Sequence, residues 1–301
     1  MSEVVVVGGG LIGSLIAYRL RQAGLEVTLL EAGQAGQATR ASAGMLAPYA
    51  EGLQGEPLAW AQESLAEYPG LVRELQAQTG LEVPLELSGV WRSAHPLRGW
   101  RDLDGLEPHP GGYLDPVRLL AAVQRAFVSL GGRLVQDEAQ RLEPGWVHTP
   151  TRRLAARQIV IAAGAWSSRF GLPVRPLKGE ALRLGGPPPP GPVFVGEGYA
   201  LPRGGQVYLG ATGREGWTPG VEAEGLRWLH RYRDAHFPHL RGAPVLQSLW
   251  GYRPAGALTV GRLEPGILAA TGHGRNGILL APATARRIVE MVLENTPKEP
   301  T

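Results

Sequence analysis

A glycine-rich turn near the N-terminus constrains this chain more than any other feature. Residues 4–7 are four consecutive valines, a run typical of a strand buried on both faces. The turn follows at once and fits the pattern G-x-G-x-x-G, with Gly8, Gly10 and Gly13 at the three fixed positions. Apolar residues at helical spacing come next, and residues 26–31 have the composition of a second strand. The sequence therefore predicts a βαβ unit of the kind that binds dinucleotides.

Each position of this turn has a distinct physical task. Gly8 allows the chain to turn tightly, and Gly10 lets the backbone approach a pyrophosphate. Gly13 allows the following helix to pack closely on the strand. Leu11 and Ile12 begin that helix, whose positive N-terminal end favours a phosphate group. We therefore expect these positions to bind the cofactor.

Glu31 ends the second expected strand, where a dinucleotide-binding unit places an acidic residue. A carboxylate at this point accepts hydrogen bonds from ribose hydroxyls and repels a 2′-phosphate, so NADP is disfavoured. The fingerprint by itself does not separate FAD from NAD.

Composition excludes several classes of protein. The 301 residues include no cysteine, which rules out disulfides, thiolate metal sites and a flavin attached through cysteine. The net charge of +3 is small and no dense basic block is present, so no nucleic-acid partner is expected. Seven scattered histidines without ligand spacing argue against a metal site. No apolar run reaches about 18 residues, and glycines interrupt the apolar start, so we expect a cytoplasmic protein without a membrane segment.

Beyond the first unit, helices and strands are mixed. Helices are expected over residues 57–79, with a break at Pro69, and over 116–130, 223–236 and 278–294. Strands are expected over residues 83–93, 157–163, 245–250 and 267–271, and a hairpin over 193–212. The strand-rich middle cannot all join one parallel sheet. We therefore predict an α/β fold, in which a doubly wound, Rossmann-type nucleotide domain is interrupted by an antiparallel-sheet substrate domain.

Six further segments carry a resemblance to a known family. They are residues 39–48 (TRASAGMLAP), 112–116 (GYLDP), 162–167 (AAGAWS), 199–203 (YALPR), 251–255 (GYRPA) and 271–284 (TGHGRNGILLAPAT). With the glycine turn, they resemble the FAD-dependent D-amino-acid oxidase superfamily, and within it the glycine oxidases of the thiamine-pathway type. The resemblance spans nearly the whole chain. It implies noncovalent FAD, an FAD-binding domain made of residues 1–80, 113–180 and 254–301, and a substrate-binding domain made of 81–112 and 181–253.

The resemblance also assigns cofactor-binding positions. Besides the glycine turn and Glu31, they are Ala32; Thr39, Arg40, Ser42, Ala43, Gly44 and Met45; Ala139; Ala163, Gly164 and Trp166; and His273, Gly274, Arg275, Asn276, Gly277, Ile278 and Leu279. Small side chains in such loops let backbone N–H groups reach phosphate and ring oxygens. Two interpretations of His273 stay open, as a group that stabilises the reduced flavin and as an ordinary hydrogen-bonding residue.

Three residues are expected to hold the substrate. In the family resembled here, the residues matching Arg253, Arg275 and Tyr199 contact the carboxylate of an amino acid. A guanidinium suits this task because it makes two parallel, charge-assisted hydrogen bonds to a carboxylate. Lys178 is open to two interpretations, as a promoter of oxygen reduction and as a structural residue.

The expected activity is the FAD-dependent oxidative deamination of glycine, and of small amines such as sarcosine, by oxygen. The products would be an imine or glyoxylate, ammonia and hydrogen peroxide, and the imine could pass to thiazole synthase. One alternative is a D-amino-acid or N-methyl-amino-acid oxidase or dehydrogenase on the same fold. Another is a non-catalytic flavin-binding subunit of a dehydrogenase complex. A homo-oligomer stays open, and residues 51–112 are short compared with the family, which predicts a trimmed lid over the site.

Overall fold

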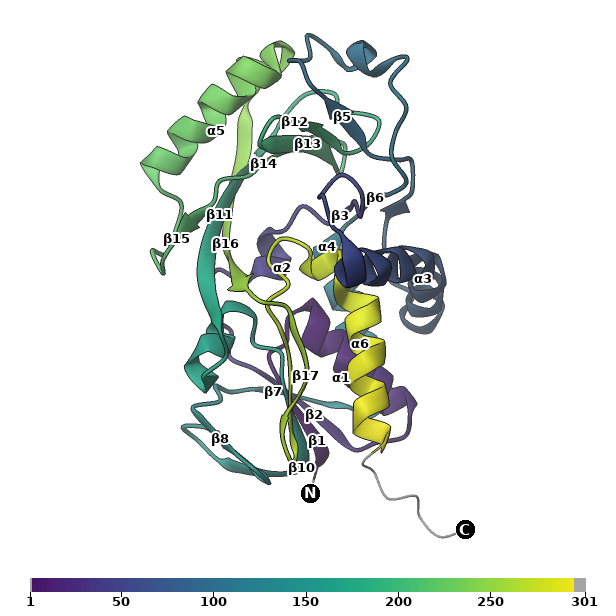
Figure 1. Ribbon diagram of the computed structural model, residues 1–301, viewed down its shortest axis with the longest axis vertical. Coiled ribbons are helices and arrows are strands. Elements are labelled where there is room, and N and C mark those ends of the chain that lie inside the picture. The colour runs from purple at the N-terminus through teal and green to yellow at the C-terminus, as the bar shows by residue number, and fades with distance from the viewer. Residues whose placement is uncertain (1, 295–301) are drawn as a thin grey trace.

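The computed structural model describes residues 2–294, so Met1 and residues 295–301 of the expected FAD-binding segments lie outside the described part. A mainly parallel sheet forms one end of the molecule (Figure 1). Its parallel strands are β1 (Ser2–Val7), β2 (Val27–Glu31), β7 (Arg133–Gln136), β10 (Arg153–Ile161) and β18 (Ile267–Thr271), and β17 (Thr259–Glu264) pairs antiparallel at the edge. The strand order is β17-β18-β10-β1-β2-β7.

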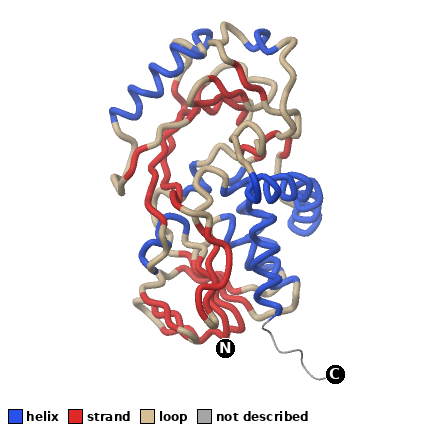
Figure 2. Tube along the Cα trace, in the orientation of Figure 1, coloured by secondary structure: helices blue, strands red, loops and turns tan. Residues whose placement is uncertain are grey.

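Both faces of this sheet are buried, as the valine run predicts. Val4 and Val6 pack against helices, whereas Val5 and Val7 face the opposite side of the sheet. The helical side holds α1 (Leu11–Gln22), α3 (Gly55–Thr79), α4 (Pro116–Ser129) and α6 (Gly277–Glu294), which pack on one another (Figure 2). On the other side, β8 (Arg141–Glu143) and β9 (Trp146–His148) form a small antiparallel extension of β10.

A second, mostly antiparallel sheet forms the other end of the molecule (Figure 1). Its strands are β5 (Trp91–Ser93), β11 (Val174–Leu184), β12 (Val193–Val195), β13 (Gly198–Arg203), β14 (Gln206–Gly210), β15 (Arg214–Glu215) and β16 (Val245–Gly256). Helix α5 (Ala223–His236) packs on this sheet and shares an apolar core with it. The long pair β11 and β16 extends from this sheet toward the parallel one.

Short elements connect the two sheets. They are α2 (Ala38–Ala41), the three-stranded sheet of β3 (Met45–Leu46), β4 (Leu85–Glu86) and β6 (Gly112–Leu114), and the 3-10 turn η2 (Gly164–Phe170). Two more 3-10 turns, η1 (Trp100–Leu103) and η3 (Pro238–Leu240), pack in the core of the antiparallel sheet. The fold class expected from the sequence is confirmed, because a parallel nucleotide-type sheet and an antiparallel sheet share the chain.

Two expected elements were wrong. Helix α3 continues through Pro69 without a break, because its apolar face is fixed between α4 and α6 by Tyr68, Leu71 and Leu75. This packing outweighs the hydrogen bond that a proline removes from a helix. Residues 83–93 form two short strands in different sheets instead of one strand, since β4 pairs with β6 and β5 pairs with β12.

The proposed domain limits stay a prediction. Two of them, at residues 180/181 and 253/254, fall inside β11 and β16, the strands that extend from the antiparallel sheet toward the parallel one. Among residues 2–294, no helix has both the length and the apolar character needed to cross a membrane.

Candidate active site

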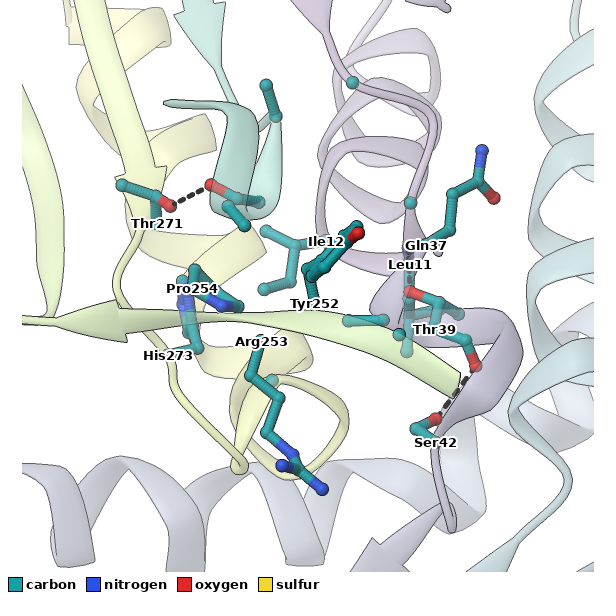
Figure 3. Close-up of a pocket in the computed structure, with 18 of the residues that line it drawn as sticks. Leu11, Ile12, Gln37, Thr39, Ser42, Tyr252, Arg253, Pro254, Thr271 and His273 are labelled. Atoms are coloured by element: carbon teal, nitrogen blue, oxygen red, sulfur yellow. Dashed lines mark hydrogen bonds between the residues drawn. The ribbon is translucent and has the colours of Figure 1, made fainter. Parts of the chain in front are cut away.

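A cavity lies where the carboxyl ends of the parallel strands meet the antiparallel sheet. Its wall includes the ends of β1, β2, β10 and β18, together with α2, η2, part of β16 and the loop before α6. Figure 3 shows residues from several of these segments around one space. In open parallel sheets, ligands bind outside the carboxyl ends of the strands, so this cavity has the expected position for a nucleotide cofactor.

Most of the residues predicted for the site line this cavity. They are Gly8, Gly10, Leu11, Ile12, Glu31, Ala32, Thr39, Ser42, Ala43, Gly44, Met45, Ala139, Ala163, Gly164, Trp166, Tyr199, Arg253, His273, Gly274, Arg275, Asn276, Gly277 and Ile278. Segments that are far apart in the sequence are thus brought to one wall. The assignment of each residue to a ligand stays a prediction.

Three predicted residues do not line the cavity. Gly13 lies where a Cβ atom would be 2.0 Å from the carbonyl oxygen of Gly8, so it serves the close packing of α1 on β1. Leu279 is buried in the apolar core around α6. The side chain of Arg40 points to a neighbouring surface groove and donates a hydrogen bond to Gln37.

The glycine turn has the geometry of a phosphate site. Gly8 has a φ of +112°, and a Cβ atom there would lie 2.4 Å from the carbonyl oxygen of Ala162, so only glycine fits. Gly10 has open space beside it, with Thr39 Oγ1 as the nearest atom at 3.5 Å from a notional Cβ. Thr39 Oγ1 accepts a hydrogen bond from the backbone of Leu11 at 3.2 Å. The start of α1 therefore faces the cavity across backbone that a phosphate can approach.

Glu31 closes one end of the cavity wall. Its Oε2 accepts a hydrogen bond from Gly9 N at 2.7 Å, and its Oε1 accepts from Gly33 N at 2.6 Å and from Gln37 Nε2 at 2.7 Å. These bonds hold the carboxylate at the end of β2, the position at which an acidic residue meets a ribose in dinucleotide-binding folds.

His273 forms part of the wall as a neutral, buried ring. Burial lowers the pKa of His273 to about 3. Its Nε2 lies 3.0 Å from Thr284 Oγ1, while Nδ1 is buried without a hydrogen-bond partner among the described residues. A buried polar atom without a partner in a cavity wall is suited to a bound ligand. The backbone at Gly8 and Gly10 can be approached by a phosphate, and Nδ1 of His273 is free to bond a ligand. The residues of this wall therefore fit a dinucleotide such as FAD.

Arg253 lies on β16 at the boundary between the two sheets. Figure 3 shows that Arg253 and Tyr252 leave opposite faces of the strand, as successive strand residues do. Arg253 Nη1 donates a hydrogen bond to the carbonyl oxygen of Thr212 at 3.0 Å. Among residues 2–294, no carboxylate lies within ion-pair distance of Arg253, so its charge is available to a ligand.

Tyr199 and Arg275 lie beside Arg253 in the same wall. The guanidinium carbon of Arg275 is 5.9 Å from the centre of the Tyr199 ring. Burial raises the pKa of Tyr199, although the charges of Arg253 and Arg275 act in the opposite direction. The phenol therefore stays protonated and can donate a hydrogen bond. Two guanidinium groups and one hydroxyl donor in one wall are groups of the kind that can bind a carboxylate.

Sequence reasoning missed Glu51. Its side chain is only 9% exposed, lines the cavity and pairs with Arg275, with 2.9 Å between Oε2 and Nε. Burial raises the pKa of Glu51, while Arg275, Arg253 and Arg92 lower it. Nothing in the local sequence distinguishes this glutamate from a surface residue, because its partner is distant in the chain.

The structural interpretation of Lys178 is the one that the contacts support. Its side chain is 2% exposed, and its Nζ lies 2.6 Å from Glu222 Oε2 and 3.5 Å from Glu180 Oε1. Arg214 completes this partly buried group of charges with ion pairs to both glutamates at 2.8 Å. Lys178 does not line the cavity.

Comparison with known proteins identifies the family. A profile described as FAD dependent oxidoreductase matches residues 3–109 and 102–291. The chain belongs to this family. The family expected from the sequence, and FAD as its cofactor, are thereby confirmed. Bound FAD supplies the acceptor for the two electrons that leave the substrate.

Individual relatives agree with this assignment. The chain is 30% identical over 345 residues to the glycine oxidase of Bacillus subtilis, covering 97% of this chain and 93% of that protein. It is 33% identical over 339 residues to the bifunctional protein ThiO/ThiG of Synechocystis, and it spans about half of that relative's length, 52%. The crystal structure of glycine oxidase from Geobacillus kaustophilus matches with a TM-score of 0.88 and 28% identity, covering 98% of this chain and 95% of that one.

Proposed function

We propose that this protein oxidises glycine, and other small amines such as sarcosine, in an FAD-dependent reaction with oxygen. One glycine, one water and one oxygen molecule would give glyoxylate, ammonia and hydrogen peroxide, with an imine as the species that water hydrolyses. The observation that carries the proposal is the group of Arg253, Arg275 and Tyr199 in the same cavity as the glycine turn. Relatives named glycine oxidase, similar over nearly their full length, support it.

The chain's own residues would bind and orient the substrate. Arg253 has no carboxylate partner among the described residues, so it can take the substrate carboxylate in two parallel hydrogen bonds. Tyr199 would add a third donor, because its hydroxyl stays protonated. Fixing the carboxylate leaves the adjacent C–H bond in a defined position, and such orientation is a major part of the catalytic effect.

Among residues 2–294, the wall near Arg253 offers no evident base for the substrate amine. Burial makes His273 a weak base, and Glu51 and Glu180 are paired with Arg275 and Arg214. We propose that solvent removes the proton of the amine. On this proposal kcat/KM for glycine rises between roughly pH 7 and 10, because the neutral amine is the reactive form. A kcat/KM that is constant over this range would contradict it.

A colour change tests the activity directly. The purified holoenzyme should lose its yellow colour when glycine is added without oxygen and regain it in air. An oxygen electrode with glycine, sarcosine, D-alanine and D-valine then separates a glycine oxidase from a D-amino-acid or N-methyl-amino-acid oxidase. Bleaching without recovery in air would instead favour a dehydrogenase, and no response to any of these amines would favour a non-catalytic subunit.

Arg253→Ala tests the carboxylate site. The variant should keep FAD, because the proposal assigns Arg253 to the substrate and the glycine turn to the cofactor. Its KM for glycine should rise by about one to two orders of magnitude when a charge-assisted hydrogen bond is lost. An unchanged KM would remove Arg253 from the site.

We also propose that the imine can pass to a thiazole synthase in the cytoplasm. The similarity to a bifunctional ThiO/ThiG protein supports such a coupling. The measurement is the ratio of glyoxylate to peroxide formed, which should fall when the thiazole synthase of the same organism is added. A ratio that does not change would contradict transfer.

A further inference from the structure

Glu51 places a negative charge at the substrate end of the cavity. It lies between β3 and α3, and its side chain reaches the wall that also holds Arg253, Arg275 and Tyr199. Its Oε2 is 2.9 Å from Arg275 Nε, and the carboxylate is almost completely shielded from water. Charges in such a shielded place interact more strongly than charges at the surface.

The charges at this end of the cavity can be counted. Glu180 also lines the wall, but Arg214 at 2.8 Å and Lys178 at 3.5 Å compensate its charge. Among the groups that line the wall here, two guanidinium groups, of Arg253 and Arg275, and one carboxylate, of Glu51, are left, while Arg92 acts on Glu51 from outside the lining. One substrate carboxylate therefore balances the charges that line the wall, and a second carboxylate on the same substrate would meet the shielded negative charge of Glu51.

We propose that Glu51 makes the site selective for amines that carry a single carboxylate. Its charge repels a second carboxylate on the same substrate, in addition to pairing with Arg275. The proposal rests on the proposed function, since it takes glycine and sarcosine as substrates. Sarcosine and iminodiacetate are a matched pair for testing it, because the N-substituent of the second ends in one more carboxylate.

Binding can be measured without turnover by using ether analogues that have no amine to oxidise. Methoxyacetate replaces sarcosine, and diglycolate replaces iminodiacetate. In titrations of the holoenzyme at pH 8.5, followed by the flavin absorbance, the wild type should bind methoxyacetate at least roughly tenfold more tightly than diglycolate. Equal affinities in the wild type would overturn the proposal, even if no variant could be purified.

Glu51→Gln keeps the size of the side chain and removes its charge. The variant should reduce the preference for methoxyacetate over diglycolate by about tenfold or more. Glu56→Gln is the matched control, since Glu56 is an exposed glutamate of the same region, and it should keep the wild-type preference. A Glu51→Gln preference within twofold of the wild type would overturn the proposal.

Turnover separates this proposal from the proposed function. Wild-type enzyme should oxidise glycine and sarcosine and be slow with iminodiacetate, and Glu51→Gln should raise the kcat/KM ratio of iminodiacetate to sarcosine by a similar factor. If the wild type oxidises glycine and both enzymes show the same ratio, the role of Glu51 is wrong while the function stands. If the wild type oxidises none of these amines, the proposed function fails.

Discussion

The guanidinium of Arg253 lies against the backbone of Gly179 on the neighbouring strand, where a Cβ atom would be 2.3–2.4 Å from its nitrogens and its central carbon. The two residues are close because β11 and β16 pair antiparallel, with Leu177 opposite Arg253. Glycine at this position thus provides the space in which Arg253 faces the cavity. The position of the proposed carboxylate site therefore depends on Gly179, which has no side chain that could contact a ligand.

Gly179→Ala should therefore displace Arg253 without unfolding the sheet, because a guanidinium at the end of a flexible side chain can move. The KM for glycine should rise by roughly tenfold, the effect of losing a charge-assisted hydrogen bond, while FAD stays bound. Gly261→Ala is the control, since open space surrounds that strand glycine. Steady-state kinetics would contradict the prediction if both variants kept the wild-type KM.

Tyr199 should act as a neutral donor over the working pH range. Its pKa is raised by burial, so the hydroxyl is protonated at pH 6.5 and at pH 9.0. Tyr199→Phe should weaken the binding of methoxyacetate by about 2- to 10-fold, the effect of one hydrogen bond. This factor should be the same at both pH values. A factor that disappears at pH 9.0 would show that the phenol ionises in the wild type.

Lys178→Met should affect stability and leave the reaction with oxygen unchanged. The substitution removes a buried ammonium and leaves Glu222 and Glu180 with Arg214 alone, so the free energy of unfolding should fall by about 2–3 kcal/mol. Stopped-flow measurement of the reduced holoenzyme in aerated buffer should give a reoxidation rate within about twofold of the wild type. A rate that falls tenfold or more would instead place Lys178 in the chemistry.

His273 should make the protein less stable in mild acid. Its pKa is about 3 in the folded state against about 6.5 in the unfolded chain. Between these values the unfolded chain binds a proton that the folded protein does not. The free energy of unfolding is therefore unaffected by this group above pH 6.5 and falls as the pH is lowered toward 3. Between pH 7.5 and 5.5 this group alone should lower the free energy of unfolding by about 1.4 kcal/mol. Urea unfolding at the two pH values measures the loss.

His273→Gln should remove that part of the pH dependence, and the exposed His95→Gln should keep it. The comparison cancels the other titrating groups, which are common to all three proteins. An identical pH dependence in His273→Gln and the wild type would mean that the ring is not held neutral by burial.

Helices, strands and turns whose stabilising contacts lie within a few residues of one another could be predicted from the sequence. The valine run and the glycine turn indicate a buried strand, a tight turn and a helix, and β1 and α1 have this order. Asp115 before Pro116 indicates a helix start, and Asp115 Oδ1 accepts hydrogen bonds from Val117 N at 2.9 Å and Arg118 N at 3.1 Å. In such cases the stabilising contacts lie within a few residues of one another, so the local pattern contains them.

The sequence by itself determined the nucleotide-type βαβ unit, the family, and most of the segments that line the cavity. Only the tertiary structure decided that α3 continues through Pro69, that Lys178 is engaged with Glu222, and that Glu51 meets Arg275. These outcomes depend on side chains from distant parts of the chain. Packing and charge pairing act over short distances in space, and neighbours in space are not neighbours in sequence.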